Sequence, residues 1–257
     1  MKFSKRDFLK ITGLTILGIG IKPAINLFAQ NEHQPVSPAP ETLAGKRWAM
    51  LVNPKACTAA NGCVDCIVAC HRIHNVPDFG NPKDEVKWIW TEHYQNVFPG
   101  QENEYLEEDL KARPFITLCN HCDNPPCVRV CPTKATFRRE DGIVMMDMHR
   151  CIGCRFCMAA CPYGSRSFNW LDPRSHIKQL NPDYPTRMKG VVEKCTFCEE
   201  RLAKGLIPAC VEACKEKALI FGNLKDPNSE VRQLLRSHYT IRRKPELGTL
   251  PQVYYMV

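Results

Sequence analysis

The cysteines constrain this chain more than any other feature, because all of them fall into four groups with a common ending. The sequence has 257 residues and 16 cysteines, and in each group three residues separate the third cysteine from the fourth. Neither a disulfide framework nor a set of zinc fingers requires that regularity, so the pattern favours four copies of one motif that binds a metal cluster. The groups are Cys57, Cys63, Cys66 and Cys70; Cys119, Cys122, Cys127 and Cys131; Cys151, Cys154, Cys157 and Cys161; and Cys195, Cys198, Cys210 and Cys214.

The third group shows the motif most completely. It runs Cys-Ile-Gly-Cys-Arg-Phe-Cys-Met-Ala-Ala-Cys-Pro from Cys151 to Pro162. Bacterial ferredoxins bind 4Fe–4S clusters with this spacing: a tight loop directs three thiolates at one cluster, and the fourth cysteine ligates a second cluster. The first group departs from the pattern, since five residues separate Cys57 from Cys63, although Asn61-Gly62 could turn the longer loop. We therefore predict four 4Fe–4S clusters, or three if the first group is impaired.

The N-terminus resembles a twin-arginine export signal, with Lys5-Arg6 in place of two arginines. A mild apolar run at 11–21 follows, and Leu27-Phe28-Ala29 offers a cleavage site. An amphipathic helix is the alternative, which the three glycines at positions 13, 18 and 20 disfavour. We predict a signal peptide at 1–29, a flexible arm at 30–45 and a periplasmic protein peripheral to the membrane, exported with its clusters already bound.

Charge and hydropathy exclude two other classes of protein. The formal net charge is +8, but residues 1–29 contribute five basic side chains and one acidic one, and the remaining cations are scattered. No basic stripe with interleaved aromatic residues indicates nucleic-acid binding. No run of about 20 apolar residues predicts a membrane span in the mature chain.

Short apolar runs between the cysteine groups predict the fold. We expect strands at 46–52, 113–118, 189–194 and 218–224, a hairpin at 136–147, a helical turn at 199–204 and a helix at 230–237. Group, hairpin and group in succession is the plan of two-cluster ferredoxins. The predicted fold is α+β, with two ferredoxin-like modules of the bacterial two-cluster type and loop-rich insertions, built around iron–sulfur clusters. It spans 46–225, with a core module at 113–165, and the tail 226–257 wraps across it or contacts a membrane subunit through basic residues 242–244.

A cysteine-free insert at 71–112 combines aromatic and acidic residues. We favour a small satellite core of aromatic side chains with a solvated acidic face over the alternative of a docking surface. The aromatic residues are Trp88, Trp90, Tyr94, Phe98 and Tyr105, and the acidic ones are Glu102, Glu104, Glu107, Glu108 and Asp109.

Three histidines lie near cysteines, namely His71, His121 and His149. Because every group is complete without them, we expect hydrogen-bonding or surface roles that tune a cluster. No residues are predicted to be catalytic, and the chain is expected to transfer electrons without a substrate site of its own.

Four such groups behind an export signal resemble the iron–sulfur electron-transfer subunits of dimethyl sulfoxide reductase, polysulfide reductase and formate dehydrogenase type. The resemblance covers the mature chain and is sharpest at 74–78, 119–127, 151–165 and 192–201. Together with the segment 78–90, these sequence segments are most similar to the periplasmic iron–sulfur O subunits of Dsr membrane complexes.

The resemblance implies crossed ligand sets, with the first group paired to the fourth and the second to the third. One cluster would use Cys119, Cys122, Cys127 and Cys161; another Cys151, Cys154, Cys157 and Cys131; a third Cys195, Cys198, Cys210 and Cys70; and a fourth Cys57, Cys63, Cys66 and Cys214. It also implies a hetero-oligomeric membrane complex containing a polytopic quinone-interacting subunit. In the Dsr type, that complex links the quinone pool and a periplasmic multihaem cytochrome c to sulfur chemistry.

Two alternatives stay open. One is the iron–sulfur subunit of a periplasmic molybdopterin oxidoreductase that acts on polysulfide, tetrathionate, nitrite or a similar compound. The other is an exported zinc or disulfide scaffold that serves as a binding module.

Overall fold

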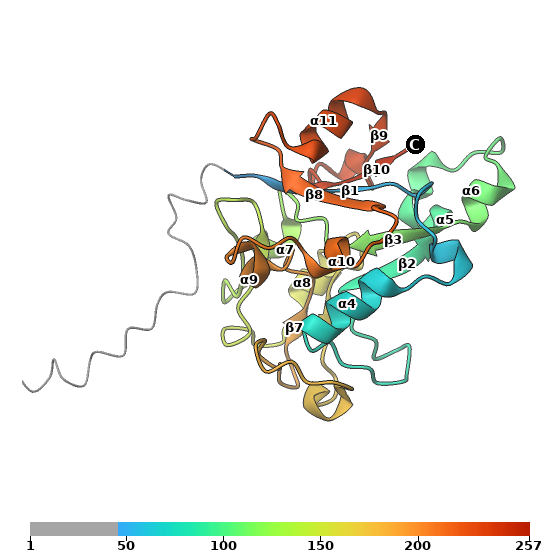
Figure 1. The fold of residues 1–257 in the computed structure, drawn as a ribbon. Coiled ribbons are helices and arrows are strands. Elements are labelled where there is room, and N and C mark those ends of the chain that lie inside the picture. The colour runs from blue at the N-terminus through green and yellow to red at the C-terminus, as the bar shows by residue number, and fades with distance from the viewer. Residues whose placement is uncertain (1–45) are drawn as a thin grey trace, which may run out of the picture. The chain divides into compact units, whose positions relative to one another are not determined.

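The computed structural model describes residues 46–257, so the predicted signal peptide and arm lie outside the described residues. Short helices and strands alternate with long connections in a mixed α and β fold (Figure 1). The strands are β1 (Trp48–Val52), β2 (Ile89–His93), β3 (Pro114–Leu118), β4 (Thr136–Arg138), β5 (Val144–Met146), β6 (Ser167–Phe168), β7 (Val192–Glu193), β8 (Leu219–Asn223), β9 (Thr240–Ile241) and β10 (Val253–Met256).

Most of the helices are a single turn. The α-helices are α4 (Asp65–Ile73), α5 (Tyr94–Val97), α6 (Glu108–Ala112), α7 (Pro126–Arg129), α8 (Phe156–Ala159), α9 (Glu199–Leu202), α10 (Ala209–Glu212) and α11 (Glu230–Ser237). The 3-10 helices are η1 (Ala59–Asn61), η2 (Pro99–Gln101), η3 (Pro173–His176) and η4 (Pro245–Leu247). The predicted helical turn at 199–204 corresponds to α9, and the predicted helix at 230–237 to α11.

The main sheet has the strand order β8-β1-β10-β9, with β1 antiparallel to β8 and parallel to β10. Strand β1 is apolar throughout because both its faces are covered. Met50 and Val52 enter the main core, whereas Ala49 and Leu51 pack with Val231 of α11 on the opposite face. Alternate residues of a strand point to opposite faces, so an uninterrupted apolar run suits this central position.

The predicted strands are confirmed, with shorter ends in places. Strand β1 lies within the predicted range 46–52, β3 within 113–118, β7 within 189–194 and β8 within 218–224. The hairpin predicted at 136–147 is formed by β4 and β5, which pair Thr136 with Met146. Gly142 supplies the left-handed residue of its turn, at φ +85°.

The aromatic residues of the insert do not form a separate satellite core, contrary to the prediction. Trp88, Tyr94 and Phe98 are buried in the main core. Phe98, for example, contacts the Tyr255 ring edge-on, with 5.2 Å between the ring centroids. Tyr105 is the exception, with 86% of its surface exposed, and the predicted acidic residues around it are exposed as well.

The tail does more than wrap across the body of the protein. It supplies β10, which lies inside the main sheet beside β1, and its Tyr255 donates a hydrogen bond to the carbonyl of Ile116. The basic residues at 242–244 face inward in part, since Arg243 is buried and Lys244 donates to the carbonyl of Pro162.

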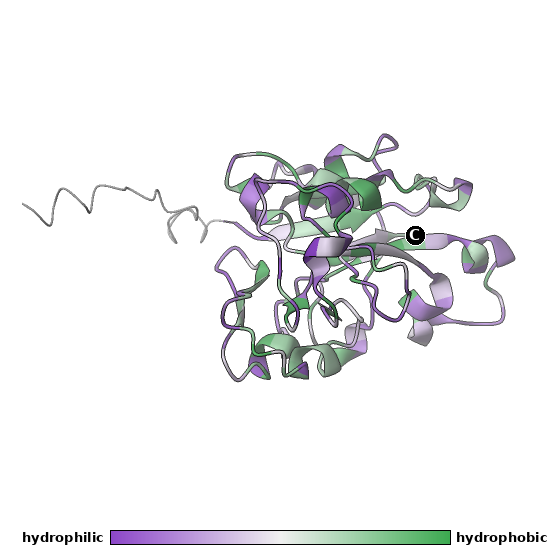
Figure 2. Cartoon of the chain, turned by 90° about the horizontal axis from the view of Figure 1, so that it is seen from below, coloured by the Kyte–Doolittle hydropathy of each residue, from purple (hydrophilic) through white to green (hydrophobic). Residues whose placement is uncertain are grey.

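Hydrophobic residues gather on the strands and short helices, and hydrophilic residues are frequent in the outer loops (Figure 2). Among residues 46–257, no helix combines the length and the hydropathy that crossing a membrane requires.

Candidate metal centres

The four cysteine groups share one backbone feature. The residue immediately before the second cysteine is left-handed in every group: φ is +83° at Gly62, +41° at His121, +69° at Gly153 and +55° at Phe197. Residues other than glycine rarely adopt this conformation. Its recurrence therefore indicates that four different sequences, including the widened first group, form the same kind of turn.

The third cysteine of each group lies on a short helix, and the fourth follows four residues later. Cys66 lies on α4, Cys127 on α7, Cys157 on α8 and Cys210 on α10. Helix α4 packs against α10, and α7 packs against α8. These contacts bring the first group to the fourth and the second group to the third, as the crossed arrangement requires.

The thiols gather in four sets, which we call A to D. In set A, the four cysteines line one hollow, and the cysteines of set C line another. In set B, burial first, and then repulsion from the other three thiols, raise the pKa of Cys70 well above its usual value. In set D, Cys131, Cys151 and Cys157 belong to one apolar cluster, which also includes Cys127 of set C, and Cys154 lies in the loop between Cys151 and Cys157. Set A is Cys57, Cys63, Cys66 and Cys214; set B is Cys70, Cys195, Cys198 and Cys210; set C is Cys119, Cys122, Cys127 and Cys161; set D is Cys131, Cys151, Cys154 and Cys157.

The sets follow one another in the order A, B, C, D. Helix α4 carries both Cys66 of set A and Cys70 of set B. Phe197, between Cys195 and Cys198 of set B, stacks on His121, which precedes Cys122 of set C. Cys127 of set C packs with Cys131 and Cys157 of set D in one apolar cluster. Each set therefore adjoins the next.

The chemistry of these donors fits a positively charged metal centre. All sixteen cysteines, which lie within the described residues, are free thiols. Burial, followed by repulsion from Cys57 and Cys214, raises the pKa of Cys66 to about 12. Burial also raises the pKa of Cys122 and that of Cys195 to about 12. Buried thiols that face one another ionise together only when cations compensate their charge, and iron ions supply that compensation.

Backbone N–H groups point at the sulfur atoms. The N–H of Ala218 donates to Cys214 Sγ at 3.2 Å, and that of Ala209 donates to Cys198 Sγ at 3.4 Å. The N–H of Phe197 donates to Cys195 Sγ at 3.4 Å. Such hydrogen bonds to ligand sulfur are one means by which proteins set the potential of iron–sulfur clusters.

Comparison with known proteins agrees with this chemistry. The family described as "4Fe-4S dicluster domain" matches residues 111–177 and 180–224. The Hdr-like menaquinol oxidoreductase iron–sulfur subunit 1 of Archaeoglobus fulgidus is 42% identical over 98% of this chain and 97% of that protein. A tetrathionate reductase subunit of Salmonella typhimurium is 36% identical over 100% of this chain and 89% of that protein. The menaquinone reductase iron–sulfur cluster-binding subunit of Nitratidesulfovibrio vulgaris is 38% identical over 82% and 88%.

The chain belongs to the ferredoxin-type iron–sulfur subunits of menaquinol oxidoreductases and related reductases. The prediction of 4Fe–4S clusters is thereby confirmed, and the broader family resemblance with it. The number of four clusters, the ligand sets A to D and the Dsr type stay predictions. Sets C and D lie wholly within the matched ranges, whereas the first cysteine group, at 57–70, precedes them.

The three histidines named from the sequence differ in their surroundings. His121 of this iron–sulfur subunit is fully buried, its ring stacks on Phe197 with 3.7 Å between centroids, and its Nδ1 accepts a hydrogen bond from the N–H of Val144. Burial and the neighbouring cations, Lys194 first, hold the pKa of His121 well below its usual value, so the ring is neutral. His149 is exposed and His71 is half-buried.

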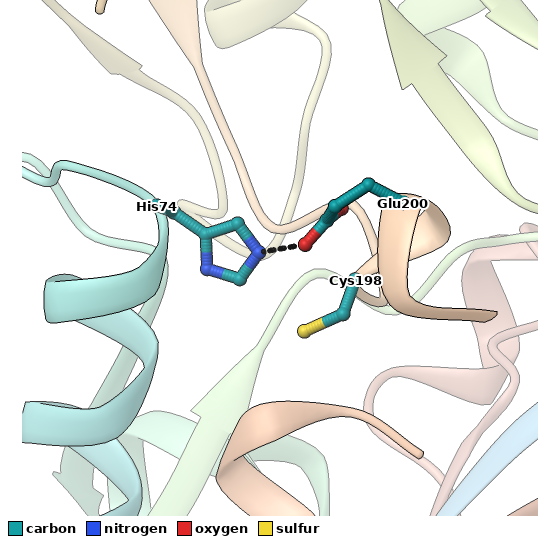
Figure 3. Close-up of side chains that lie close together, drawn as sticks. All are labelled: His74, Cys198 and Glu200. Atoms are coloured by element: carbon teal, nitrogen blue, oxygen red, sulfur yellow. Dashed lines mark hydrogen bonds and ion pairs between the residues drawn. The ribbon is translucent and has the colours of Figure 1, made fainter. Parts of the chain in front are cut away.

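A fourth histidine, His74, was not predicted from the sequence to lie near a cysteine set. Figure 3 shows His74 facing Glu200 beside Cys198, and the three donor atoms lie within 4.8 Å of one another. His74 Nε2 is 3.0 Å from the Glu200 carboxylate, and Nδ1 lies 2.9 Å from the carbonyl of Cys70. Because Cys70 and Cys198 both belong to set B, the histidine adjoins that set and does not form a separate metal site. Its position one helical turn after Cys70 was the available signal.

Two buried cations near the sets, Arg166 and Lys194, were not predicted from the sequence either. Arg166 donates to Cys127 Sγ at 3.1 Å, and Lys194 precedes Cys195 with no exposed surface. No spacing rule marks either residue, because the burial of Lys194 and the contact of Arg166 with Cys127 arise only in the folded chain.

Proposed function

We propose that this iron–sulfur subunit binds four 4Fe–4S clusters, one in each of sets A to D, and relays electrons along the row. The continuous order of the four crossed sets supports this proposal. When bound, 4Fe–4S clusters supply one-electron redox chemistry. The chain's own residues hold the sulfur ligands in place, keep water from them and offset their charge.

The proposed partner is a polytopic membrane subunit that interacts with quinone. Two relatives are named as a menaquinol oxidoreductase subunit and a menaquinone reductase subunit, which supports a quinone-linked complex. Because the motifs resemble Dsr O subunits, we further propose a link to sulfite or sulfate metabolism, with a periplasmic multihaem cytochrome c as a second partner. We place the protein in the periplasm, on the evidence of its N-terminal sequence alone.

A molybdopterin oxidoreductase is the second candidate for the parent complex. The match to the tetrathionate reductase subunit, which extends over the whole of this chain, supports it. The two candidates share the electron relay proposed here and differ in the catalytic subunit that it serves.

The number of clusters is tested by analysing the anaerobically purified protein for iron and acid-labile sulfide. Four clusters predict about sixteen iron atoms per chain. About twelve would indicate that set A, which contains the widened first group, does not hold a complete cluster. Zinc in place of iron, or a colourless protein with blocked thiols, would refute the relay and support the scaffold instead.

The parent complex is tested by isolating it from membranes through a tag on this iron–sulfur chain. Reduction of the clusters by a soluble menaquinol analogue, with a polytopic subunit present and no molybdenum, supports the quinone-linked Dsr type. Molybdenum in stoichiometric amount supports the molybdopterin alternative. Recovery of this chain without any membrane subunit contradicts the proposed partner.

A further inference from the structure

Five lysine and arginine side chains are buried within residues 46–257, and two of them have carboxylate partners. Arg47 pairs with Asp123 at 2.8 Å, and Arg187 pairs with Glu193 at 2.7 Å. No ion pair within the described range joins Arg166, Lys194 or Arg243 to a carboxylate. Of these three, Arg243 lies over the ring of Tyr163 and donates to the carbonyl of Val97. Arg166 and Lys194 remain as buried cations beside cysteines: Arg166 donates to the sulfur of Cys127, and Lys194 to the carbonyl of Cys195.

Arg166 lies between sets C and D. It is 5% exposed, and one guanidinium nitrogen donates to Cys127 Sγ of set C at 3.1 Å. The other terminal nitrogen donates to Thr136 Oγ1 at 3.0 Å. The backbone N–H of Thr136 in turn donates to Cys131 Sγ, which belongs to set D, at 3.5 Å. One guanidinium therefore contacts set C directly and reaches set D through Thr136.

Lys194 lies between sets B and C. Its side chain is fully buried, and its Nζ donates to the carbonyl of Cys195. Cys195 belongs to set B, and Phe197 in the same loop stacks on His121, which precedes Cys122 of set C, with 3.7 Å between the ring centroids. The ammonium therefore lies in the loop of set B that meets set C.

A buried cation without a counter-ion is strongly unfavourable, since the protein interior cannot replace its hydration. An arginine does not escape this cost by losing its proton, because its side chain stays charged in proteins. Thiolates that ligate a cluster supply the missing negative charge. The two cations are thus placed where a row of negatively charged centres would require them.

We propose that Arg166 and Lys194 are positioning residues that act as fixed counter-ions at two successive junctions, Arg166 between sets C and D and Lys194 between sets B and C. This inference rests on the proposed function, in that it assumes clusters in the four sets. A cation between two centres favours the reduced form of both and weakens the repulsion between electrons on neighbouring centres. It therefore raises both potentials together and keeps adjacent steps of the relay matched.

The test is a redox titration of the whole protein followed by electron paramagnetic resonance, which resolves the individual clusters. Arg166→Gln is expected to lower the potentials of two of the four transitions by at least about 59 mV each, which is a tenfold change in the reduction equilibrium. Lys194→Gln is expected to shift two transitions, one of which is also shifted by Arg166→Gln. In the double variant three transitions shift, and the fourth, belonging to set A, keeps its wild-type potential.

Two further variants separate charge from structure. Arg166→Lys retains the charge and is expected to restore most of the potential. Arg150→Gln removes an exposed cation that directly precedes Cys151 and is 66% exposed, so solvent screening makes its expected shift small. Equal shifts in Arg150→Gln and Arg166→Gln, or no shift in either buried variant, would overturn the inference.

The iron content keeps the test decisive if a variant loses clusters. Loss of about half the iron in Arg166→Gln, restored in Arg166→Lys, supports a counter-ion at the junction of sets C and D. Loss of all the iron, or the same loss in Arg166→Lys, refutes it in favour of a general folding role. Failure of the proposed function is a different result, namely a wild-type protein without iron.

Discussion

Arg187 and Glu193 form an ion pair 2.7 Å long, in which the two side chains are 2% and 0% exposed. Glu193 also accepts hydrogen bonds from Trp88 Nε1 at 3.0 Å and from the Asn169 amide. Arg187 donates to the carbonyl of Asn75, at 2.8 Å, just beyond the end of α4. The pair therefore joins the aromatic insert, the connector after the third cysteine group and the helix that carries Cys66 and Cys70.

The first prediction concerns the stability that depends on this pair. Glu193→Gln should destabilise the protein by about 3 kcal/mol, because it leaves the Arg187 guanidinium buried without a counter-ion. The expected observation is a lower midpoint of thermal unfolding, measured anaerobically with the clusters retained.

A matched control is an ion pair on the surface. Asp172 and Arg174 lie 2.6 Å apart with exposed side chains, so Asp172→Asn should leave the unfolding midpoint unchanged. If Asp172→Asn and Glu193→Gln lowered the midpoint equally, burial would not be the reason for the importance of the Arg187–Glu193 pair.

The cysteine spacing predicted much of this architecture because each group encodes a local turn and a helix start. The hairpin at Asp141-Gly142 and helix α11 were predictable for the same reason, since turn residues and apolar periodicity act over a few positions. The place where the insert packs was not predictable from such local signals. Trp88 and Phe98 reach the main core through contacts with distant segments, such as that of Phe98 with Tyr255.

The positions of the charged residues around the candidate site were equally unpredictable from the sequence. Arg166 meets Cys127 across 39 positions, and His74 meets Glu200 across 126. A lone arginine or histidine is most often a surface or hydrogen-bonding residue, so only the folded arrangement distinguishes these two. In the tail, β10 was missed because its partner β1 lies far earlier in the chain, with Met50 opposite Val253.

The second prediction tests the crossed sets. Cys161→Ala should damage the cluster of set C, whose other ligands come from the second group, and leave the cluster of Cys151, Cys154 and Cys157 intact. The measurement is electron paramagnetic resonance of the reduced protein, together with an expected loss of up to about four iron atoms.

Cys131→Ala is the reciprocal variant. It should damage set D and spare set C, although Cys131 belongs to the second group in the sequence. If each variant instead lost the signal of its own sequence group, the ligands would not cross between groups.

The third prediction concerns export, and it rests on residues outside the described range. Changing Lys5 and Arg6 together to Gln should leave the protein in the cytoplasm, because the twin-arginine route recognises a basic pair. The measurement is cell fractionation followed by immunoblotting. Changing Lys2 and Lys10 to Gln removes the same charge outside the pair and should permit export. Normal export of the Lys5/Arg6 variant would remove the basis for a periplasmic location.

The fourth prediction concerns Gly153, in the loop between Cys151 and Cys154. A Cβ at this position would lie 2.4 Å from the carbonyl oxygen of Gly190, and φ is +69°, so Gly153→Ala must displace the backbone that shapes set D. We expect loss of the set D cluster, observed as about four fewer iron atoms and one missing resonance signal. Gly164→Ala is the matched control, since φ is +65° but nothing lies within 4 Å of the added carbon. It should cost about 1 kcal/mol of backbone strain and retain every cluster. Equal iron loss in both variants would show that the left-handed backbone matters and the close approach to Gly190 does not.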